Sequence, residues 1–193
     1  MQDILFDFIS KYISLTEDEK NAIVSLDIFR SVKKGTTLLE AGQKSKDSYF
    51  VLKGCIRTYY IIDGEEKTTA FYTEMDPLTP QCVINKAPAD YFIDCVEDSI
   101  LLISNSDMEA EINGKFPKFD VMCRMLSEEL LVKHQIDFAE FKTSSPEQRY
   151  LTLIQKRPDL IQRVPQHQLA SYLGIKPQSL SRLRARILEK SKI

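Results

Sequence analysis

The chain has 193 residues, of which 43% are hydrophobic and 28% are charged, a composition typical of a soluble globular protein. No apolar run approaches the length that a membrane-spanning helix needs, and the first residues, MQDILFDFISKYI, lack the pattern of a secretory signal. Four cysteines lie far apart without a CxxC spacing, which argues against a zinc ribbon or a disulfide framework. We therefore expect free buried thiols, no metal, no membrane and a cytoplasmic location.

The charge is distributed unevenly around a formal net value of −2. From position 142 onward the chain holds 11 Lys and Arg against 3 Asp and Glu, whereas the first 141 residues hold 15 against 25. A basic module on an acidic body is typical of a chain in which one segment binds a polyanion. A solvated basic helix face would have the same composition, so charge leaves both interpretations open.

Residues 1–117 show a helical start followed by β patterning. Thr16 can cap a helix, and Glu19 can complete its capping box. Short β-branched and aromatic segments then follow at about ten-residue spacing: TTLLEAG, SYFVLKG, CIRTYYIIDG, KTTAFYT and, later, YFIDCVEDSILLIS. Asp63-Gly64 between two of these segments is a strong hairpin signal. The pattern predicts a β sandwich or barrel as the first domain.

Residues 118–142 contain no Gly or Pro and predict one long helix. Apolar residues at alternating spacings of four and three form a heptad-like seam, which predicts a homodimer interface. The predicted interface residues are Phe119, Cys123, Leu126 and Leu130. A helix packed on its own barrel would show a similar stripe, so this alternative stays open.

Residues 143–193 predict a helical domain that begins at Ser145, with Pro146 in the first turn and Gln148 closing a capping box. Pro158 is expected to end that helix, and Pro165 to begin another. Further on, HQLASYLGIKPQSLSRLRAR predicts two helices joined by a sharp turn. Gly174 suits the left-handed backbone of such a turn, and Pro177 suits the first position of the second helix. This pattern is typical of a helix-turn-helix.

The second of these helices has two different faces. Leu180, Leu183 and Ile187 share the face that is expected to pack on the first helix. Polar and basic side chains recur on another face, where arginine can pair with guanine and glutamine with adenine in the major groove. The predicted DNA-binding residues are Gln166, His167, Lys176, Gln178, Ser179, Arg182 and Arg186.

The stretch RVPQHQLASYLGIKPQSLSRLRARI resembles the DNA-binding domain of the cyclic-AMP receptor protein/Fnr (Crp/Fnr) superfamily of bacterial transcription regulators. The upstream KKGTTLLEAGQKSKDSYFVLKGCIRTYYIIDGEEKTTAFYTE looks like the jelly-roll effector domain of that family. The resemblance covers nearly the whole chain. It implies an α+β fold with a cyclic-nucleotide-binding-type β jelly roll, a long dimerisation helix and a C-terminal helix-turn-helix. It implies double-stranded promoter DNA, a second copy of the chain and RNA polymerase as partners.

The sequence departs from that family in three respects. Where cyclic-nucleotide binders have a Gly-Glu pair and an Arg-Ser pair for the phosphate, this chain has Pro77-Leu78 and Pro88-Ala89, and no arginine lies between Arg57 and Arg124. No cysteine cluster for an iron–sulfur centre is present, and we expect no cofactor. The chain also ends soon after the recognition helix, so a full wing is not expected.

Any effector is therefore expected to be apolar or weakly polar rather than cyclic AMP, although its identity stays open. The aromatic density near the nucleotide-binding position suggests a pocket formed by Phe71, Tyr72, Glu74, Tyr91 and Phe92. Two alternative functions are compatible with a jelly roll. A ligand-binding sensor or interaction module that never meets DNA would leave the basic helix-turn-helix without a role. A cupin-like enzyme would need converging histidines, but His134 and His167 both lie outside the barrel segment, so we expect no enzymatic activity.

Overall fold

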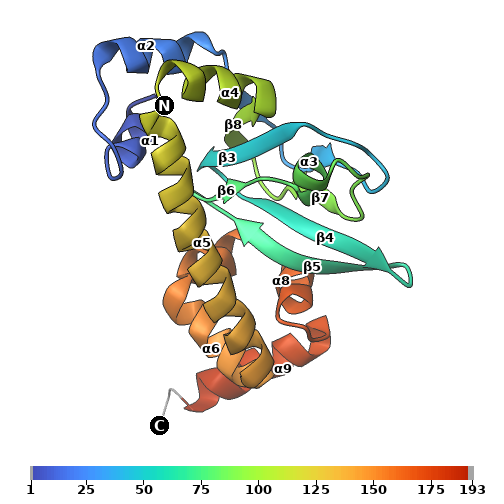
Figure 1. Cartoon of the computed structure of the whole chain (residues 1–193). Helices are drawn as coiled ribbons and strands as arrows, with labels where there is room; N and C mark the ends of the chain where they lie inside the picture. Colours follow the sequence, from blue (N-terminus) through green and yellow to red (C-terminus); the bar gives the residue numbers. More distant parts are fainter. Residues whose placement is uncertain (1, 191–193) are drawn as a thin grey trace.

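The computed structural model describes residues 2–190, except the side chain of residue 190. Its N-terminal half contains an antiparallel sandwich, and a long helix runs along one side of the sandwich toward a group of C-terminal helices (Figure 1). One sheet has, in spatial order, β1 (Phe29–Val32), β8 (Ser99–Asn105), β3 (Asp47–Lys53) and β6 (Pro77–Leu78). The other has β2 (Thr37–Leu39), β7 (Phe92–Cys95), β4 (Ile56–Ile62) and β5 (Glu65–Tyr72). The expected jelly roll is confirmed.

The hairpin between β4 and β5 turns at Asp63-Gly64, as the sequence predicts. Both residues have positive φ, 53° and 76°, which is the backbone of the tight turns that match the twist of two paired strands. Because β5 pairs only with β4, its other edge is a free sheet edge. Helix α8 (Gln166–Tyr172) packs against this edge, where Ser171 binds backbone groups of β5.

The interior of the sandwich is closed by side chains from both sheets. Leu39, Val51, Ile56, Ile93 and Leu101 are at most 2% exposed and belong to one apolar cluster. Alternate residues of each strand point inward, which is why the sequence shows a two-residue period. Cys82 and Cys95 are buried in the same cluster, and Cys55 is buried elsewhere, which confirms the expected free buried thiols except at the exposed Cys123.

Helices cover one end of the sandwich. They are α1 (Gln2–Ile9), α2 (Glu17–Ser25) and α4 (Ser106–Lys115), while the short α3 (Gln81–Asn85) lies between β6 and β7. Thr16 caps α2, and the predicted capping box with Glu19 is present. Glu19 also forms an ion pair with Lys118 at 2.7 Å, which ties α2 to the start of the long helix.

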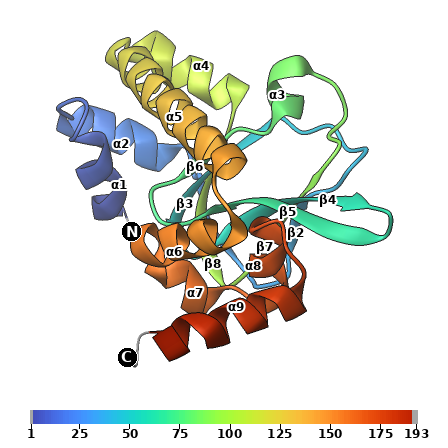
Figure 2. The ribbon, with the colours of Figure 1, turned by 90° about the horizontal axis from the view of Figure 1, so that it is seen from below.

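The C-terminal helices are α5 (Lys118–Thr143), α6 (Pro146–Lys156), α7 (Pro158–Arg163), α8 (Gln166–Tyr172) and α9 (Pro177–Lys190). The expected capping box of Ser145 and Gln148 begins α6. Pro158 ends α6 as expected, and it also occupies the first turn of α7, a six-residue helix without a clear signal in the sequence. Seen from below, α6 to α9 gather on one side of the sandwich, with α9 outermost (Figure 2).

Within residues 2–190 no helix is both long enough and apolar enough to cross a membrane. The expectation about a missing wing concerns the chain after α9, where residues 191–193 lie outside the described part.

Candidate DNA-binding surface and effector domain

Helices α8 and α9 are joined by a turn whose geometry follows from Gly174. Gly174 has a φ of 71°, and its N–H donates to the carbonyl of Ser171 at 2.9 Å. The N–H of Ile175 donates to the carbonyl of Ala170 at 3.0 Å. These two bonds form the Schellman arrangement that ends a helix at a left-handed residue. The helix-turn-helix predicted from this glycine is confirmed.

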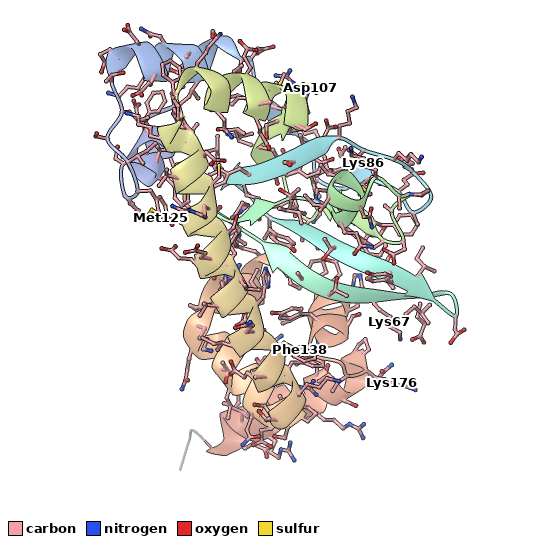
Figure 3. All side chains as sticks on the ribbon, in the orientation of Figure 1. Lys67, Lys86, Asp107, Met125, Phe138 and Lys176 are labelled. Atoms are coloured by element: carbon pink, nitrogen blue, oxygen red, sulfur yellow. The ribbon has the colours of Figure 1, made fainter. Side chains whose placement is uncertain are left out.

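The two faces of α9 separate as the spacing predicts. Leu180 is fully buried and Leu183 is 6% exposed, and both pack with Leu169 and Leu173 of the first helix. Ile187 packs against the same cluster. Gln178 and Arg182 are exposed on the other side, and Lys176 is exposed just before α9. The side chain of Lys176 projects from the turn into solvent (Figure 3).

Ser179, Arg182 and Arg186 line one open groove of about 520 Å³, together with Pro146, Ile175 and Leu183. The groove therefore joins three of the predicted DNA-binding residues. Arg186 already forms an ion pair with Glu147 of α6 at 2.9 Å, which orients its guanidinium.

Gln166 and His167 lie at the other end of the candidate surface, at the start of α8. His167 is exposed. The amide of Gln166 donates to the hydroxyl of Ser181 at 2.7 Å. Gln166 thus links α8 to α9, a contact that its predicted role in DNA binding did not include.

The barrel contains a cavity of about 90 Å³, lined by Thr58, Tyr60, Thr69, Tyr72, Leu78 and Tyr91. Only Tyr72 and Tyr91 of the predicted effector residues lie there. Burial raises the pKa of Tyr72 to about 12, and the hydroxyl of Tyr91 accepts a hydrogen bond from the backbone of Gln81 at 3.3 Å.

Phe71, Glu74 and Phe92, the other predicted effector residues, do not line this cavity. Phe71 precedes Tyr72 in β5 and therefore points to the opposite face of the sheet, where its ring lies 5.3 Å from that of Tyr172. Phe92 stacks on Tyr59 with ring centroids 5.1 Å apart. Glu74 lies in the turn after β5 and accepts a hydrogen bond from the backbone N–H of Gly54 at 2.9 Å.

The four residues of the predicted dimer seam differ in how far the chain itself buries them. Phe119 is 4% exposed and belongs to an apolar cluster with Phe8, Ile23 and Phe50 of the same chain, so it is not available to a partner. Leu126 packs against this cluster, Leu130 is half-buried, and only Cys123 is exposed. The stripe read from the sequence largely faces the chain's own core. The large apolar side chains of α5 that are exposed are Val121, Met125, Leu131, Val132, Ile136, Phe138 and Phe141.

Sequence reasoning missed Arg163, at the end of α7. Its guanidinium donates to both carboxylate oxygens of Glu74 at 2.9 Å, to Glu97 and to the carbonyl of Gly54 at 2.8 Å. Burial alone would raise the pKa of Glu74, but the hydrogen bonds from Arg163 and Gly54 lower it below its ordinary value. No local pattern could reveal this network, because its members are far apart in sequence.

The residues described contain no cluster of three or more His, Cys, Asp or Glu side chains suited to a metal ion. A family model described as cyclic nucleotide-binding domain matches residues 29–112, the segment from β1 into α4.

Two curated relatives align with most of the chain. The regulatory protein HlyX of Actinobacillus pleuropneumoniae is 24% identical over 169 residues, and the alignment covers 81% of this chain and 70% of the HlyX chain. The fumarate and nitrate reduction regulatory protein of Vibrio cholerae is 24% identical over 176 residues, covering 85% of this chain and 70% of its own.

Solved structures show the same fold. The global regulator CLP of Xanthomonas campestris, described as responsive to c-di-GMP, superposes with a TM-score of 0.67 at 13% identity, over 91% of this chain and 93% of its own. Together with the helix-turn-helix and the jelly roll, these likenesses make the chain similar, over most of its length, to transcription regulators of the Crp/Fnr type.

Proposed function

We propose that this chain regulates transcription as a homodimer that binds double-stranded DNA through α9. The observation that carries the proposal is the division of α9 into a buried face, with Leu180 and Leu183, and an exposed face, with Gln178 and Arg182. An exposed arginine one turn into such a helix can reach the floor of the major groove and pair with guanine. Bound at a promoter in the cytoplasm, the dimer would also meet RNA polymerase.

The exposed apolar side of α5 supports the homodimer. This helix has 26 residues, a length of about 39 Å. Val121, Met125, Val132 and Ile136 are 40–56% exposed and repeat at spacings of four and seven. A second copy of α5 would bury these side chains in a coiled-coil seam. The seam would hold two α9 helices at the spacing of successive major grooves, about 34 Å.

The barrel is proposed to sense an apolar or weakly polar molecule rather than a cyclic nucleotide. Tyr60, Tyr72 and Tyr91 leave a cavity of only about 90 Å³ between the sheets. Neither Pro77 nor Pro88 offers a charged group to a phosphodiester.

Selection of duplexes from a random DNA pool tests the proposed function, followed by binding titrations with the selected duplex. Arg182→Ala should weaken binding by about 1–3 kcal/mol and relax the preference at one base position in each half-site. Arg30→Ala is the matched control, because Arg30 lies on the barrel beside Asp27 and its loss changes the net charge equally. If the native protein selects no sequence, or if Arg182→Ala keeps the full preference, the proposed function is wrong.

A further inference from the structure

The exposed side of α9 carries a stripe of four residues at a regular spacing. Gln178, Ser181, Arg182 and Ala185 are all exposed, and the last three follow the first by three, four and seven positions. A helix with about 3.6 residues per turn places such positions on one face. Helices that lie in the major groove contact bases from positions with this same spacing. Because α9 is the outermost of the C-terminal helices (Figure 2), this stripe is the part of α9 that can face base pairs.

Two of the predicted DNA-binding residues lie beside this stripe rather than on it. Ser179 and Arg186 line the open groove that also includes Pro146 of α6, and Arg186 is held there by its ion pair with Glu147. Helical geometry turns both residues by about 80–100° from Gln178. They are therefore placed for the sugar–phosphate backbone, and the bases are left to the stripe.

The four members of the stripe differ in their chemistry. The hydroxyl of Ser181 accepts a hydrogen bond from Gln166 at 2.7 Å, so it is engaged within the helix-turn-helix. Gln178 and Arg182 have long side chains that reach base edges, where glutamine pairs with adenine and arginine with guanine. Ala185 carries no polar side-chain atom. Its methyl group can therefore contribute to binding only by covering another apolar group.

Ala185 is flanked by two arginines that point away from each other. Arg184 is half-buried and Arg186 is exposed, and each is turned by about 100° to one side of Ala185. On a helix in the major groove these two directions lead toward the phosphate backbones that form the walls of the groove. The small side chains of Ser181 and Ala185 lie between them, so the backbone of α9 can approach the floor of the groove closely.

The floor of the major groove offers one apolar target. Among the four bases, thymine alone presents a methyl group there, and alanine is one of the residues that contact it. Glu189 extends the stripe by one further turn and is exposed. Its carboxylate is repelled by the phosphates, which limits base contacts to the residues before it. Ala185 is thus the last position of α9 that can reach a base.

We propose that Ala185 is a specificity-determining residue that selects a thymine through its C5-methyl group, in a half-site that Gln178 and Arg182 also read. This inference rests on the proposed function, because it requires α9 to enter the major groove. Arg182 and Ala185 are about 4.5 Å apart along the helix axis, and successive base pairs are about 3.4 Å apart. The thymine should therefore lie within about two base pairs of the guanine that Arg182 contacts.

Replacement of thymine by deoxyuridine tests the proposal, because it removes the C5-methyl group and keeps every hydrogen-bonding group of the base. The probe is the duplex that the full native chain selects from a random pool, with one thymine replaced at a time. At one position in each half-site the replacement should weaken binding about fourfold, the effect of one buried methyl group. If no single replacement weakens binding, Ala185 reads no methyl group, and the inference is wrong while the proposed function stands. A native chain that selects no duplex overturns both.

Ala185→Ser identifies the side chain that makes the contact. Serine places a hydroxyl against the methyl group, so the difference between thymine and deoxyuridine at the sensitive position should fall from about fourfold to less than about twofold. Ala185→Gly, which removes the contacting group, should give the same loss. Ala110→Ser changes an exposed alanine of α4 in the same way and should keep the full difference.

The position of the sensitive thymine supplies a further check. It should lie within about two base pairs of the position at which Arg182→Ala relaxes the base preference. A thymine effect that lies further away, or one that persists at full size in folded Ala185→Ser and Ala185→Gly, assigns the methyl contact to another residue and overturns the inference. Either result leaves the reading of guanine by Arg182, and with it the proposed function, untouched.

Discussion

Ser171 and Thr68, 103 positions apart in the sequence, are joined by a hydrogen bond of 2.9 Å in which the backbone of an edge strand donates to a helix side chain. The same hydroxyl donates to the carbonyl of Glu66. A serine in the first helix of the DNA-binding motif therefore acts as a partner for the sensor sheet, which connects the two parts of the chain at one atom.

Ser171→Ala should lower the free energy of unfolding by about 1–2 kcal/mol, because it leaves a part-buried N–H and a carbonyl without their partner. Urea unfolding followed by circular dichroism measures this change. Ser10→Ala, at an exposed position, is the control and should change stability by less than about 0.5 kcal/mol. Equal midpoints for the two variants would mean that water replaces the Ser171 hydroxyl without loss.

Ile136→Glu should convert the dimer into a monomer. Ile136 is 56% exposed on α5, and a second copy would enclose the new carboxylate in an apolar seam at a cost of several kcal/mol. Size-exclusion chromatography with light scattering gives the mass directly. Val24→Glu introduces the same charge at a 36% exposed position on α2 and should leave the mass unchanged. A dimeric Ile136→Glu would place the interface elsewhere.

Lys176→Ala should weaken binding to all duplex sequences alike, since a lysine at the turn before α9 contacts phosphate rather than bases. The slope of log K against log salt should fall by about 1. Lys33, which pairs with Asp98 on the barrel, provides the control variant Lys33→Ala, whose slope should equal that of the native protein. A loss confined to one DNA sequence would instead assign Lys176 to base recognition.

Cyclic AMP and cyclic GMP should produce no heat of binding in titration calorimetry. The tyrosines leave about 90 Å³ between the sheets, and small-molecule sites in proteins usually measure about 300–1,000 Å³. Micromolar binding of either nucleotide would show that the tyrosines move aside.

Tyr72 should make the fold sensitive to alkaline pH. Burial raises its pKa to about 12, above the ordinary value of about 10. The folded chain holds this proton more tightly, so its contribution is complete below pH 10 and is lost between pH 10 and 12, at about 1.4 kcal/mol per pH unit. Urea unfolding at pH 9, 10 and 11 should therefore show a shallower decline for Tyr72→Phe than for the native chain. Parallel declines would mean that Tyr72 reaches solvent.

Local signals in the sequence were sufficient to predict turns and helix ends wherever the local backbone conformation strongly favours one residue type. Asp63-Gly64 predicted the hairpin, Ser145 with Gln148 predicted the start of α6, and Gly174 predicted the turn between α8 and α9. Each of these depends on a positive φ or on a capping hydrogen bond within four residues. The spacing of Leu180 and Leu183 predicted the inner face of α9 for the same reason, because helical periodicity is local.

What the sequence by itself determined is the set of elements, their order, the basic character of the C-terminal part and the exposed face of α9. Only the tertiary structure decided which side of α5 meets the chain's own core, because Phe119 and Ile136 are both apolar and differ only in what packs against them. It also decided that Phe71 contacts Tyr172 and that Glu74 binds Arg163, so that both residues face the C-terminal helices rather than the cavity. In the same way, it brought Arg163 to three loops of the barrel. These contacts join residues 66 to 109 positions apart. They follow from how the sheets and helices pack, and neither propensity nor periodicity carries that information.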